Sequence, residues 1–343
     1  MKPEIEKPDH IIKLTQNENA FGASPLALKS IEENYHSVFR YPDVFHIELK
    51  QKLADKFSVK PENIVISAGS VALMDMSIKA FVGDGENVVT AELTFEGYKY
   101  MSRVNHRECR QSKLTNNSID LKKILELCDE KTRLIFIANP NNPTGTINTH
   151  AEMVELMENI PPETYVVSDE AYVEYVTDSN FPDTQSLQKT YPNLIIFKTF
   201  SKIYGLAGLR VGYAIAHEDV ISTLRDHWTP FSINGLGYPA AIASLDDEQY
   251  IKKCAAVNAE ERTYLYKELI ALGFNAVEPK GNFIFIQFDT KSEAEQVNKQ
   301  LEEDGILIRP LDRFGSDTAL RITVGMPDEN RYVVECLKKR KSQ

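Results

Sequence analysis

The chain contains few cysteines and little that would bind a metal. Of its 343 residues only four are cysteine, namely Cys109, Cys128, Cys254 and Cys336. No two of them form a C-x-x-C pair and none lies in a cluster with histidine, which argues against a zinc site and against a disulfide framework. We therefore expect small apolar core residues with reduced thiols, no metal, and a cytoplasmic location.

Long apolar runs and an excess of positive charge are also missing. The longest apolar runs are strand-sized, well short of the ~20 residues that a membrane span needs. Residues 1–10 carry prolines and charges in place of the apolar run of a signal peptide. With 39 lysines and arginines against 50 aspartates and glutamates, the formal net charge is −11, and an acidic surface repels phosphate backbones. The sequence thus predicts neither membrane insertion nor nucleic-acid binding.

What the chain does contain is an alternation of apolar runs with helical stretches. The hydrophobic fraction is 42%, which is enough for a sizeable core. Continuous β-branched runs separated by helices are typical of a mostly parallel sheet covered on both faces. The sequence therefore predicts a doubly wound α/β domain with strands at 63–67, 87–91, 132–138, 164–168, 193–198 and 211–216.

The two ends of the chain differ from this pattern. The N-terminal segment lacks helical periodicity and predicts an extended arm, followed by helices at 25–35 and 45–57. Residues 242–272 are strongly helical and precede a smaller α+β domain. Its expected elements are strands at 283–288, 306–308 and 320–323 and helices at 292–304 and 330–339. The predicted division is an arm at 1–30, a large domain at 31–240 and a small domain at 241–343.

Polar motifs follow four of the predicted strands, at the edge where ligands bind in open α/β sheets. The turn Ser67-Ala68-Gly69-Ser70 precedes a helix. Its glycine and the free N–H groups of the helix N-terminus suit a phosphate, although many turns of this kind bind no ligand. The loop from Asn139 to Gly145 reads N-P-N-N-P-T-G. Its two prolines make it stiff, so it either presents an asparagine amide to a ligand or simply forms a tight turn.

The other two strand ends carry charge. Asp169 follows Y-V-V-S, and a buried carboxylate is costly unless it pairs with a cation, such as a protonated pyridine nitrogen, or caps the next helix. Lys202 follows K-T-F-S, and a lysine at a buried strand end can form a Schiff base with an aldehyde cofactor. Thr199, Ser201 and Arg210 can hold a phosphate dianion beside it.

Taken together, these motifs resemble those of the histidinol-phosphate aminotransferases, a branch of the fold-type I pyridoxal 5′-phosphate (PLP) enzymes in the aspartate aminotransferase superfamily. The resemblance extends from about Leu14 to the C-terminal helix and is carried, in chain order, by N-E-N-A-F-G-A-S-P, R-Y-P-D, A-G-S, N-P-N-N-P-T-G, S-D-E-A-Y, T-F-S-K, G-L-A-G-L-R-V-G-Y and L-R-I-T-V-G. It implies a PLP-dependent aminotransferase with ping-pong transfer of an amino group between a small-molecule donor, with histidinol phosphate favoured, and 2-oxoglutarate.

The resemblance also implies roles for residues around the cofactor ring. Lys202 forms the internal aldimine with PLP and then moves a proton between the substrate Cα and the cofactor C4′. Asp169 pairs with the pyridinium nitrogen, while Asn142 and Tyr172 hydrogen-bond the 3-oxygen of the ring. Phe95, in T-F-E-G-Y, stands where the family places the aromatic side chain that stacks on the ring, although it can equally be a core residue.

The cofactor phosphate and the subunit arrangement follow from the same resemblance. The residues that it implies for the phosphate are Gly69, Ser70, Val71, Thr199, Ser201 and Arg210. Tyr41, in R-Y-P-D, resembles the tyrosine that reaches into the neighbouring subunit's site, or else is a surface turn residue. The resemblance thus implies a homodimer with shared active sites, in which the N-terminal arm packs on the small domain and on the partner subunit.

Four residues are implied on the substrate side. Arg321, in L-R-I-T-V-G, matches the arginine that binds a substrate carboxylate in the superfamily and a substrate phosphate in the histidinol-phosphate enzymes, and a guanidinium suits both anions. Arg309 lies near the position of a second phosphate-contacting arginine, or is a surface residue at a strand end. Asn19 and Phe21 belong to the arm motif that faces the substrate.

Three departures from the family pattern leave the amino donor open. The arm reads A-F-G-A where P-Y-G-P is usual, Val71-Ala72 replaces an acidic pair, and Phe95 replaces the stacking tyrosine. Fewer polar groups around the side-chain pocket favour an apolar or aromatic donor. An aminotransferase for aromatic or other amino acids is therefore the alternative. A PLP decarboxylase or lyase, or a non-catalytic PLP-binding protein, ranks below both.

Overall fold

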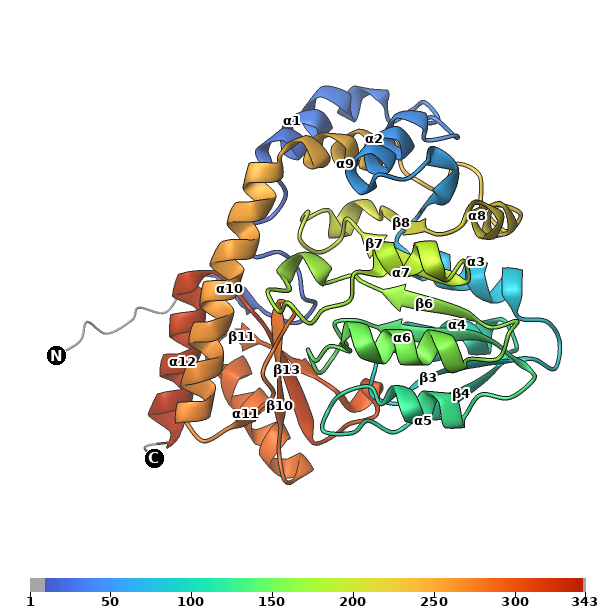
Figure 1. The fold of residues 1–343 in the computed structure, drawn as a ribbon. Coiled ribbons are helices and arrows are strands. Elements are labelled where there is room, and N and C mark those ends of the chain that lie inside the picture. The colour runs from blue at the N-terminus through green and yellow to red at the C-terminus, as the bar shows by residue number, and fades with distance from the viewer. Residues whose placement is uncertain (1–9, 342–343) are drawn as a thin grey trace.

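The computed structural model describes residues 10–341 (Figure 1). Residues 1–9, which are predicted to belong to the arm and to contain no signal peptide, lie outside the described residues. The described chain forms a seven-stranded mixed sheet, a four-stranded antiparallel sheet and a two-stranded pairing of the arm. Within residues 10–341 no helix is both long and apolar enough to cross a membrane.

The large sheet has the strand order β2-β8-β7-β6-β5-β3-β4. Its strands are β2 (Ile64–Ser67), β3 (Asn87–Ala91), β4 (Glu108–Ser112), β5 (Thr132–Ala138), β6 (Tyr165–Asp169), β7 (Leu194–Thr199) and β8 (Gly212–Ile215). Strand β8 runs antiparallel to β2 and β7, and the pairings among β7, β6, β5, β3 and β4 are parallel. The predicted α/β class with a mostly parallel sheet is therefore confirmed.

Helices cover both faces of this sheet because alternate strand residues point to opposite sides. Phe136 of β5 packs in one apolar cluster with residues of α3, α4 and α8, whereas its neighbour Ile135 packs in a second cluster with α5, α6 and α7. These helices are α3 (Ser70–Phe81), α4 (Gly97–Val104), α5 (Leu121–Glu126), α6 (His150–Asn159), α7 (Thr184–Thr190) and α8 (Glu218–Arg225). Because helices cover both faces of the sheet, both sets of strand side chains are buried, and the strands therefore have continuous apolar sequences.

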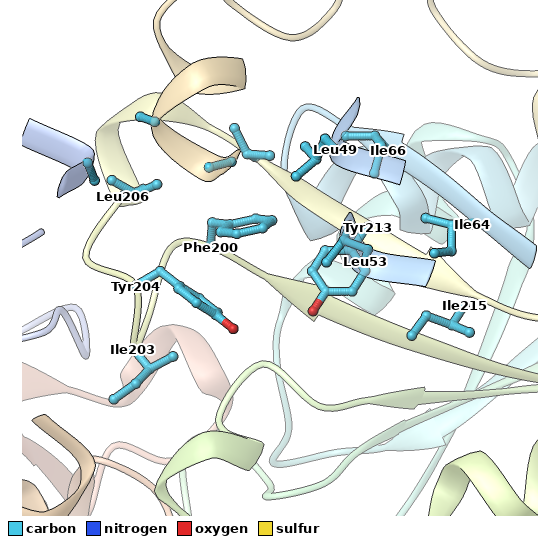
Figure 2. Close-up of a cluster of buried hydrophobic side chains, with 14 of the residues drawn as sticks. Leu49, Leu53, Ile64, Ile66, Phe200, Ile203, Tyr204, Leu206, Tyr213 and Ile215 are labelled. Carbon is cyan, nitrogen blue, oxygen red and sulfur yellow. The ribbon is translucent and has the colours of Figure 1, made fainter. Parts of the chain in front are cut away.

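A third apolar cluster lies beside the β2–β8–β7 end of the sheet. Figure 2 shows Leu49 and Leu53 of α2 next to Ile64 and Tyr213 of the strands. The helices on this side are α1 (Pro25–Asn34), α2 (Ile47–Phe57) and α9 (Gly237–Asp246). Helix α1 begins where the sequence predicts, since the Ser24 side chain accepts a hydrogen bond from the Ala27 N–H.

The C-terminal part forms the smaller α+β unit. Its four-stranded sheet has the order β12-β13-β10-β9, and β1 (Ile12–Lys13) of the arm pairs in parallel with β11 (Ile306–Leu307) beside it. The remaining strands and helices are β9 (Asn275–Ala276), β10 (Phe283–Gln287), β12 (Arg309–Pro310), β13 (Ala319–Thr323), α10 (Glu248–Ala271), α11 (Lys291–Glu303) and α12 (Pro327–Lys341). Within residues 10–341 there are also five 3-10 turns: η1 (Tyr35–Ser37), η2 (Pro61–Asn63), η3 (Val173–Tyr175), η4 (Ala207–Leu209) and η5 (Asp312–Phe314). Figure 1 shows α10 running from α1 and α9 down to this unit.

The structure also contains elements that were not predicted, among them the short strands β1, β9 and β12 and the helices α5, α7 and α8, and it differs from the expectation at β4 and at residues 242–272. Strand β4 was not predicted because its residues E-C-R-Q-S are polar, which fits an edge strand that pairs on one side with β3. The long helical stretch predicted at 242–272 is two helices, since α9 ends at Asp246 and α10 begins at Glu248.

Candidate active site

The polar strand ends meet at one edge of the large sheet. Ala138, at the end of β5, pairs with Asp169 at the end of β6, and Asp169 pairs with Phe197 of β7. A cavity of about 260 Å³ opens there, between the strand ends, the arm and the smaller unit. Among its lining residues are twelve of the predicted site residues, namely Ser70, Val71, Phe95, Asn142, Asp169, Tyr172, Thr199, Ser201, Lys202, Arg210, Arg309 and Arg321.

Lys202 lies at the centre of this arrangement. It follows the end of β7 by three residues, and the Ser201 N–H donates to Thr199 Oγ1 at 3.0 Å to shape the turn between them. The Lys202 Nζ donates to the backbone carbonyl of Gln16 at 2.8 Å and lies 5.5 Å from the centre of the Tyr172 ring. The amine therefore lies between the arm and the cavity, and no carboxylate among residues 10–341 is bonded to it.

Asp169 is a buried carboxylate, 6% exposed, at the end of β6. Its Oδ2 accepts a hydrogen bond of 2.8 Å from the Tyr98 hydroxyl, and its Oδ1 accepts one of 3.3 Å from the Ala171 N–H. Burial raises the pKa of the Asp169 carboxyl to about 6, while these two hydrogen bonds and the Lys202 charge act in the opposite direction. The next element is the turn η3, whose N-cap is Tyr172, so Asp169 does not cap it.

A corner of the cavity combines groups that suit a phosphate dianion. Gly69 has φ +85° and precedes α3, whose first residues Ser70 and Val71 carry N–H groups without an intrahelical acceptor. The Arg210 Nη1 donates to Ser201 Oγ at 3.2 Å. A Cβ atom on Gly69 would lie 2.4 Å from Arg210 Nη2, so the guanidinium occupies the space that this glycine leaves open.

Strand β8 brings the two halves of this corner together. Gly212 pairs with Ser67 of β2 on one side and with Thr199 of β7 on the other. A Cβ atom on Gly212 would lie 2.8 Å from the carbonyl carbon of Gly69, so only glycine allows the backbones to approach this closely. The turn before α3 and the turn before Lys202 therefore face the same volume.

Two hydrogen-bonding side chains lie next to Lys202. The Tyr172 hydroxyl accepts a hydrogen bond of 3.1 Å from Asn17 Nδ2 of the arm. Asn142 is buried, and its Oδ1 accepts a hydrogen bond from Arg321 Nη1. Because the amide oxygen is used, the Asn142 NH₂ group and the Tyr172 O–H proton can be donated to an oxygen of a bound molecule.

Two arginines from the smaller unit close the opposite side of the cavity. Arg309 of β12 pairs in register with Arg321 of β13. Arg321 is 4% exposed, its Nη2 donates to the Thr15 carbonyl at 2.7 Å, and its Nε is buried without a hydrogen-bond partner in the described chain. Burial lowers the pKa of Arg321 to about 10, and the Arg309 charge acts in the same direction. Within residues 10–341 neither guanidinium forms an ion pair, so the pair is suited to an incoming anion.

Four predicted residues are not among those that line this cavity: Gly69, which lies against Arg210 as described above, and Asn19, Phe21 and Tyr41. The Asn19 Nδ2 donates to the Ile203 carbonyl at 2.8 Å, and Phe21 packs against the cluster of Figure 2. Tyr41 is 83% exposed, and its ring lies 4.8 Å from that of Phe231. Their predicted contacts with substrate and with a partner's site stay predictions.

Several residues that line or support the site were not predicted from the sequence. Thr15, Gln16 and Asn17 line the cavity in place of the arm residues that were predicted. Tyr98 also lines it, and its signal was present, because in T-F-E-G-Y it follows Phe95 by three residues and so falls on the same side of a helical turn.

The sequence is similar to known proteins along nearly its whole length. It matches the family of class I and II aminotransferases over residues 9–337, which is nearly the whole chain. The chain belongs to this family. The predicted enzyme class, an aminotransferase, is thereby confirmed.

The relatives of this aminotransferase are consistent with one another. It is 38% identical over 329 residues to the histidinol-phosphate aminotransferase of Moorella thermoacetica, covering 96% of this chain and 85% of that protein. It is equally identical, 38% over 330 residues, to the histidinol-phosphate aminotransferase of Caldicellulosiruptor saccharolyticus, covering 96% and 92%. The chain is thus similar to histidinol-phosphate aminotransferases along nearly its full length, as predicted.

A solved structure extends the likeness to the fold. The crystal structure of histidinol-phosphate aminotransferase from Sinorhizobium meliloti in complex with pyridoxal-5′-phosphate superimposes on this aminotransferase with a TM-score of 0.89. The two chains are 27% identical, with 96% of this chain and 92% of that chain covered. The predicted fold-type I architecture is confirmed by this match.

Proposed function

We propose that this aminotransferase holds pyridoxal 5′-phosphate at the edge of the large sheet and transfers the amino group of histidinol phosphate to 2-oxoglutarate, which would place it in histidine biosynthesis in the cytoplasm. The observation that carries the donor assignment is the pair of guanidiniums, Arg309 and Arg321, in one cavity with Lys202. The similar proteins named above act as histidinol-phosphate aminotransferases, which supports the same donor.

The residues present fit the cofactor. A dianionic phosphate suits the corner formed by the N-terminus of α3, Ser201 and Arg210. The buried Asp169 carboxylate needs a cationic partner and is matched by a protonated ring nitrogen. Asn142 and Tyr172 have protons to donate to the 3-oxygen. Phe95 lines the same cavity and can lie against the ring face.

Bound PLP supplies an electron sink that stabilises negative charge at the substrate Cα. The rest of the chemistry belongs to residues of this chain. Lys202 Nζ would hold the cofactor covalently in the resting enzyme, and as a free amine it would take the proton from the substrate Cα. Asp169 keeps a negative charge at the ring nitrogen. The arm contacts the Lys202 amine through the Gln16 carbonyl, which orients the amine in the cavity.

Arg321 and Arg309 determine which molecules bind productively. A phosphate monoester at one end of the donor can accept hydrogen bonds from both guanidiniums. The distal carboxylate of 2-oxoglutarate can take the same place in the second half-reaction, because a planar carboxylate matches the fork of Arg321. One anion site can thus serve both substrates, which bind in turn in a ping-pong reaction.

The test is a scan of single half-reactions on the PLP-loaded enzyme. Histidinol phosphate, phenylalanine, tyrosine, glutamate and aspartate are added separately while the absorbance of the bound cofactor is followed. We expect histidinol phosphate to react fastest among the donors that lack a distal carboxylate. Arg309→Ala should slow it at least about tenfold and leave phenylalanine unchanged, since a hydrogen bond to a charged group contributes about that much.

Other outcomes of this scan favour the alternatives. Rapid reaction of phenylalanine or tyrosine with no reaction of histidinol phosphate would replace the proposed donor by an aromatic amino acid. Release of CO₂ without any need for a 2-oxo acid would point to a decarboxylase. Either result would leave the family membership intact and overturn the proposed substrate.

A homodimer with shared active sites is the second part of the proposal. The surface of α1, η1, the following loop and the start of α2 exposes many large apolar side chains, more than an isolated chain usually leaves in water. They are Leu26, Leu28, Tyr35, Val38, Phe39, Tyr41, Phe45 and Ile47, joined by Phe231. A second copy of the chain would bury this surface and receive Tyr41.

The domain limits are part of the same proposal: an arm at 1–30, a large domain at 31–240 and a small domain at 241–343. The arm packs on the small domain through β1 and, in the proposed dimer, on the partner subunit.

Sedimentation velocity of the PLP-loaded enzyme tests the homodimer. We expect the mass of two chains, and Phe39→Glu, at a position 75% exposed, should lower it toward that of one chain because a buried charge without a partner is costly. Ile270→Glu, at a similarly apolar but remote position that is 45% exposed, is the control and should leave the mass unchanged. A single-chain mass for the unmodified enzyme at micromolar concentration would contradict the proposal.

A further inference from the structure

Tyr98 of α4 is the largest buried side chain in contact with the cavity that the proposed reaction leaves without a role. Its side chain is 0% exposed, and its hydroxyl donates a hydrogen bond of 2.8 Å to Oδ2 of Asp169. The bond joins residues 71 positions apart in sequence. A buried hydroxyl aimed at a buried carboxylate is a specific contact, because within residues 10–341 neither the hydroxyl nor the Oδ2 atom of Asp169 has another hydrogen-bond partner.

The Tyr98 ring is held firmly from two sides. It stacks on Phe136 of β5, with ring centres 4.8 Å apart and an interplanar angle of 6°. It also meets Phe95 edge-on, at 5.7 Å and 83°. One side chain therefore contacts both the carboxylate proposed for the ring nitrogen and the aromatic residue proposed for the ring face.

We propose that Tyr98 is a positioning residue for Asp169. Its hydrogen bond fixes the Asp169 carboxylate in one orientation and keeps this carboxylate a weaker base than the cofactor ring nitrogen, so that the proton stays on the ring. This inference rests on the proposed function, because it assumes that Asp169 is the partner of that nitrogen. Tyr98 acts through Asp169 and Phe95 and is not itself a catalytic residue.

The electrostatics of the site give the direction of the effect. Burial raises the pKa of Asp169, which favours a neutral carboxyl, and the hydrogen bond from Tyr98 is the largest influence against it. The other groups that act on Asp169 are the Ala171 N–H and Lys202, which favour the anion, and Glu170, which opposes it. Burial and the Asp169 charge hold the pKa of Tyr98 well above its usual range, so the hydroxyl remains a donor throughout the working pH.

The simpler interpretation is that Tyr98 only fills space between Phe136 and Phe95. Tyr98→Phe separates the two interpretations, because it keeps the ring and both ring contacts and removes only the hydroxyl. Tyr213→Phe is a matched control. Tyr213 is also 0% exposed, and its hydroxyl is buried without a hydrogen-bond partner among residues 10–341. Figure 2 shows it among the apolar side chains of the cluster beside β8.

The experiment uses the holoenzyme reconstituted with PLP carrying ¹⁵N in the ring. The ¹⁵N chemical shift reports whether the ring nitrogen is protonated, and equilibrium titration of the apoenzyme gives the dissociation constant of PLP. In Tyr98→Phe we expect the shift to move from the pyridinium value toward that of neutral pyridine. The dissociation constant should rise about tenfold, as expected for the loss of a hydrogen bond to a charged group. Tyr213→Phe should change neither quantity.

Asp169→Asn and the double variant distinguish the inference from the function on which it rests. Asp169→Asn alone should move the ¹⁵N shift at least as far as Tyr98→Phe, and adding Tyr98→Phe to it should have no further effect. If Tyr98→Phe leaves the shift at the unmodified value while Asp169→Asn moves it, the role of Tyr98 is overturned and that of Asp169 stands. If Asp169→Asn also leaves the shift unchanged, the proposed contact of Asp169 with the ring nitrogen is itself wrong.

Discussion

Replacing Lys202 by alanine is expected to lower turnover by at least about a thousandfold, because the chain then lacks both the covalent attachment and the amine that takes the Cα proton. The absorbance of covalently bound cofactor should disappear as well. PLP itself should still bind, more weakly, since the phosphate corner around Arg210 and Ser201 is untouched by the substitution. The nearby lysine in the sequence, Lys198 of β7, does not replace it, because its amine is buried in an ion pair with Glu170 at 2.8 Å.

The matched control for this variant is Lys299→Ala, an exposed lysine on α11 far from the strand ends. It should keep the turnover and the absorbance of the unmodified enzyme. A Lys202→Ala protein that folds, retains turnover and keeps the absorbance of the covalently bound form would remove Lys202 from the mechanism. Far-ultraviolet circular dichroism establishes that the variant is folded before either readout is interpreted.

Arg321→Ala is the second substitution with a large expected effect. The guanidinium is buried between the rings of Phe283 and Phe314, at 5.4 and 5.7 Å, and it anchors Asn142. We expect the specificity constant, kcat/KM, to fall by about a hundredfold or more in both half-reactions, since a bidentate, charge-assisted contact is lost. The KM values of the amino donor and of 2-oxoglutarate should rise together, because one anion site serves both.

Two further variants separate charge from shape at this site. Arg321→Lys keeps the positive charge and loses the planar fork, so it should recover only part of the loss. Arg313→Ala removes an exposed arginine from η5, in the same part of the smaller unit, and should leave both KM values unchanged. An Arg321→Ala enzyme with unchanged KM for both substrates would show that the substrates bind elsewhere.

The seven-stranded sheet was largely predictable because its signal is local and periodic. Strands buried on both faces read as unbroken apolar runs, and the strand predicted at 132–138 has those limits in the structure. The edge strand β4 carries no such signal, since pairing with β3 stabilises a polar sequence that has little strand tendency of its own. Strand β8 was predicted as a strand, but its antiparallel direction depends on how the chain returns from Lys202 and is not encoded in its own residues.

The site was predictable as far as its motifs follow strand ends. Asp169, Asn142 and Lys202 come together because parallel strands end at one edge of a sheet, and this follows from the strand predictions alone. The arm is different. Which of its residues reach the cavity depends on the pairing of β1 with β11, so Gln16 and Asn17 line it while Asn19 bonds to Ile203.

The contact between Tyr98 and Asp169 shows the same limit on prediction from the sequence. The aromatic motif T-F-E-G-Y directs attention to Phe95, and only the packing of α4 against Phe136 brings the hydroxyl of Tyr98 to a carboxylate on β6. Contacts between distant segments determine the chemical properties of individual side chains. Because tertiary packing sets these contacts, they are the hardest features to predict from sequence patterns.

The most direct test of the central claim is to locate the covalently held cofactor. Borohydride treatment of the PLP-loaded enzyme converts the link between cofactor and lysine into a stable secondary amine, and peptide mass spectrometry then identifies the modified residue. We predict a single modified lysine, Lys202, with labelling lost in Lys202→Ala and retained in Lys299→Ala. Modification of another lysine, with Lys202 unmodified, would contradict the placement of the active site at this edge of the sheet.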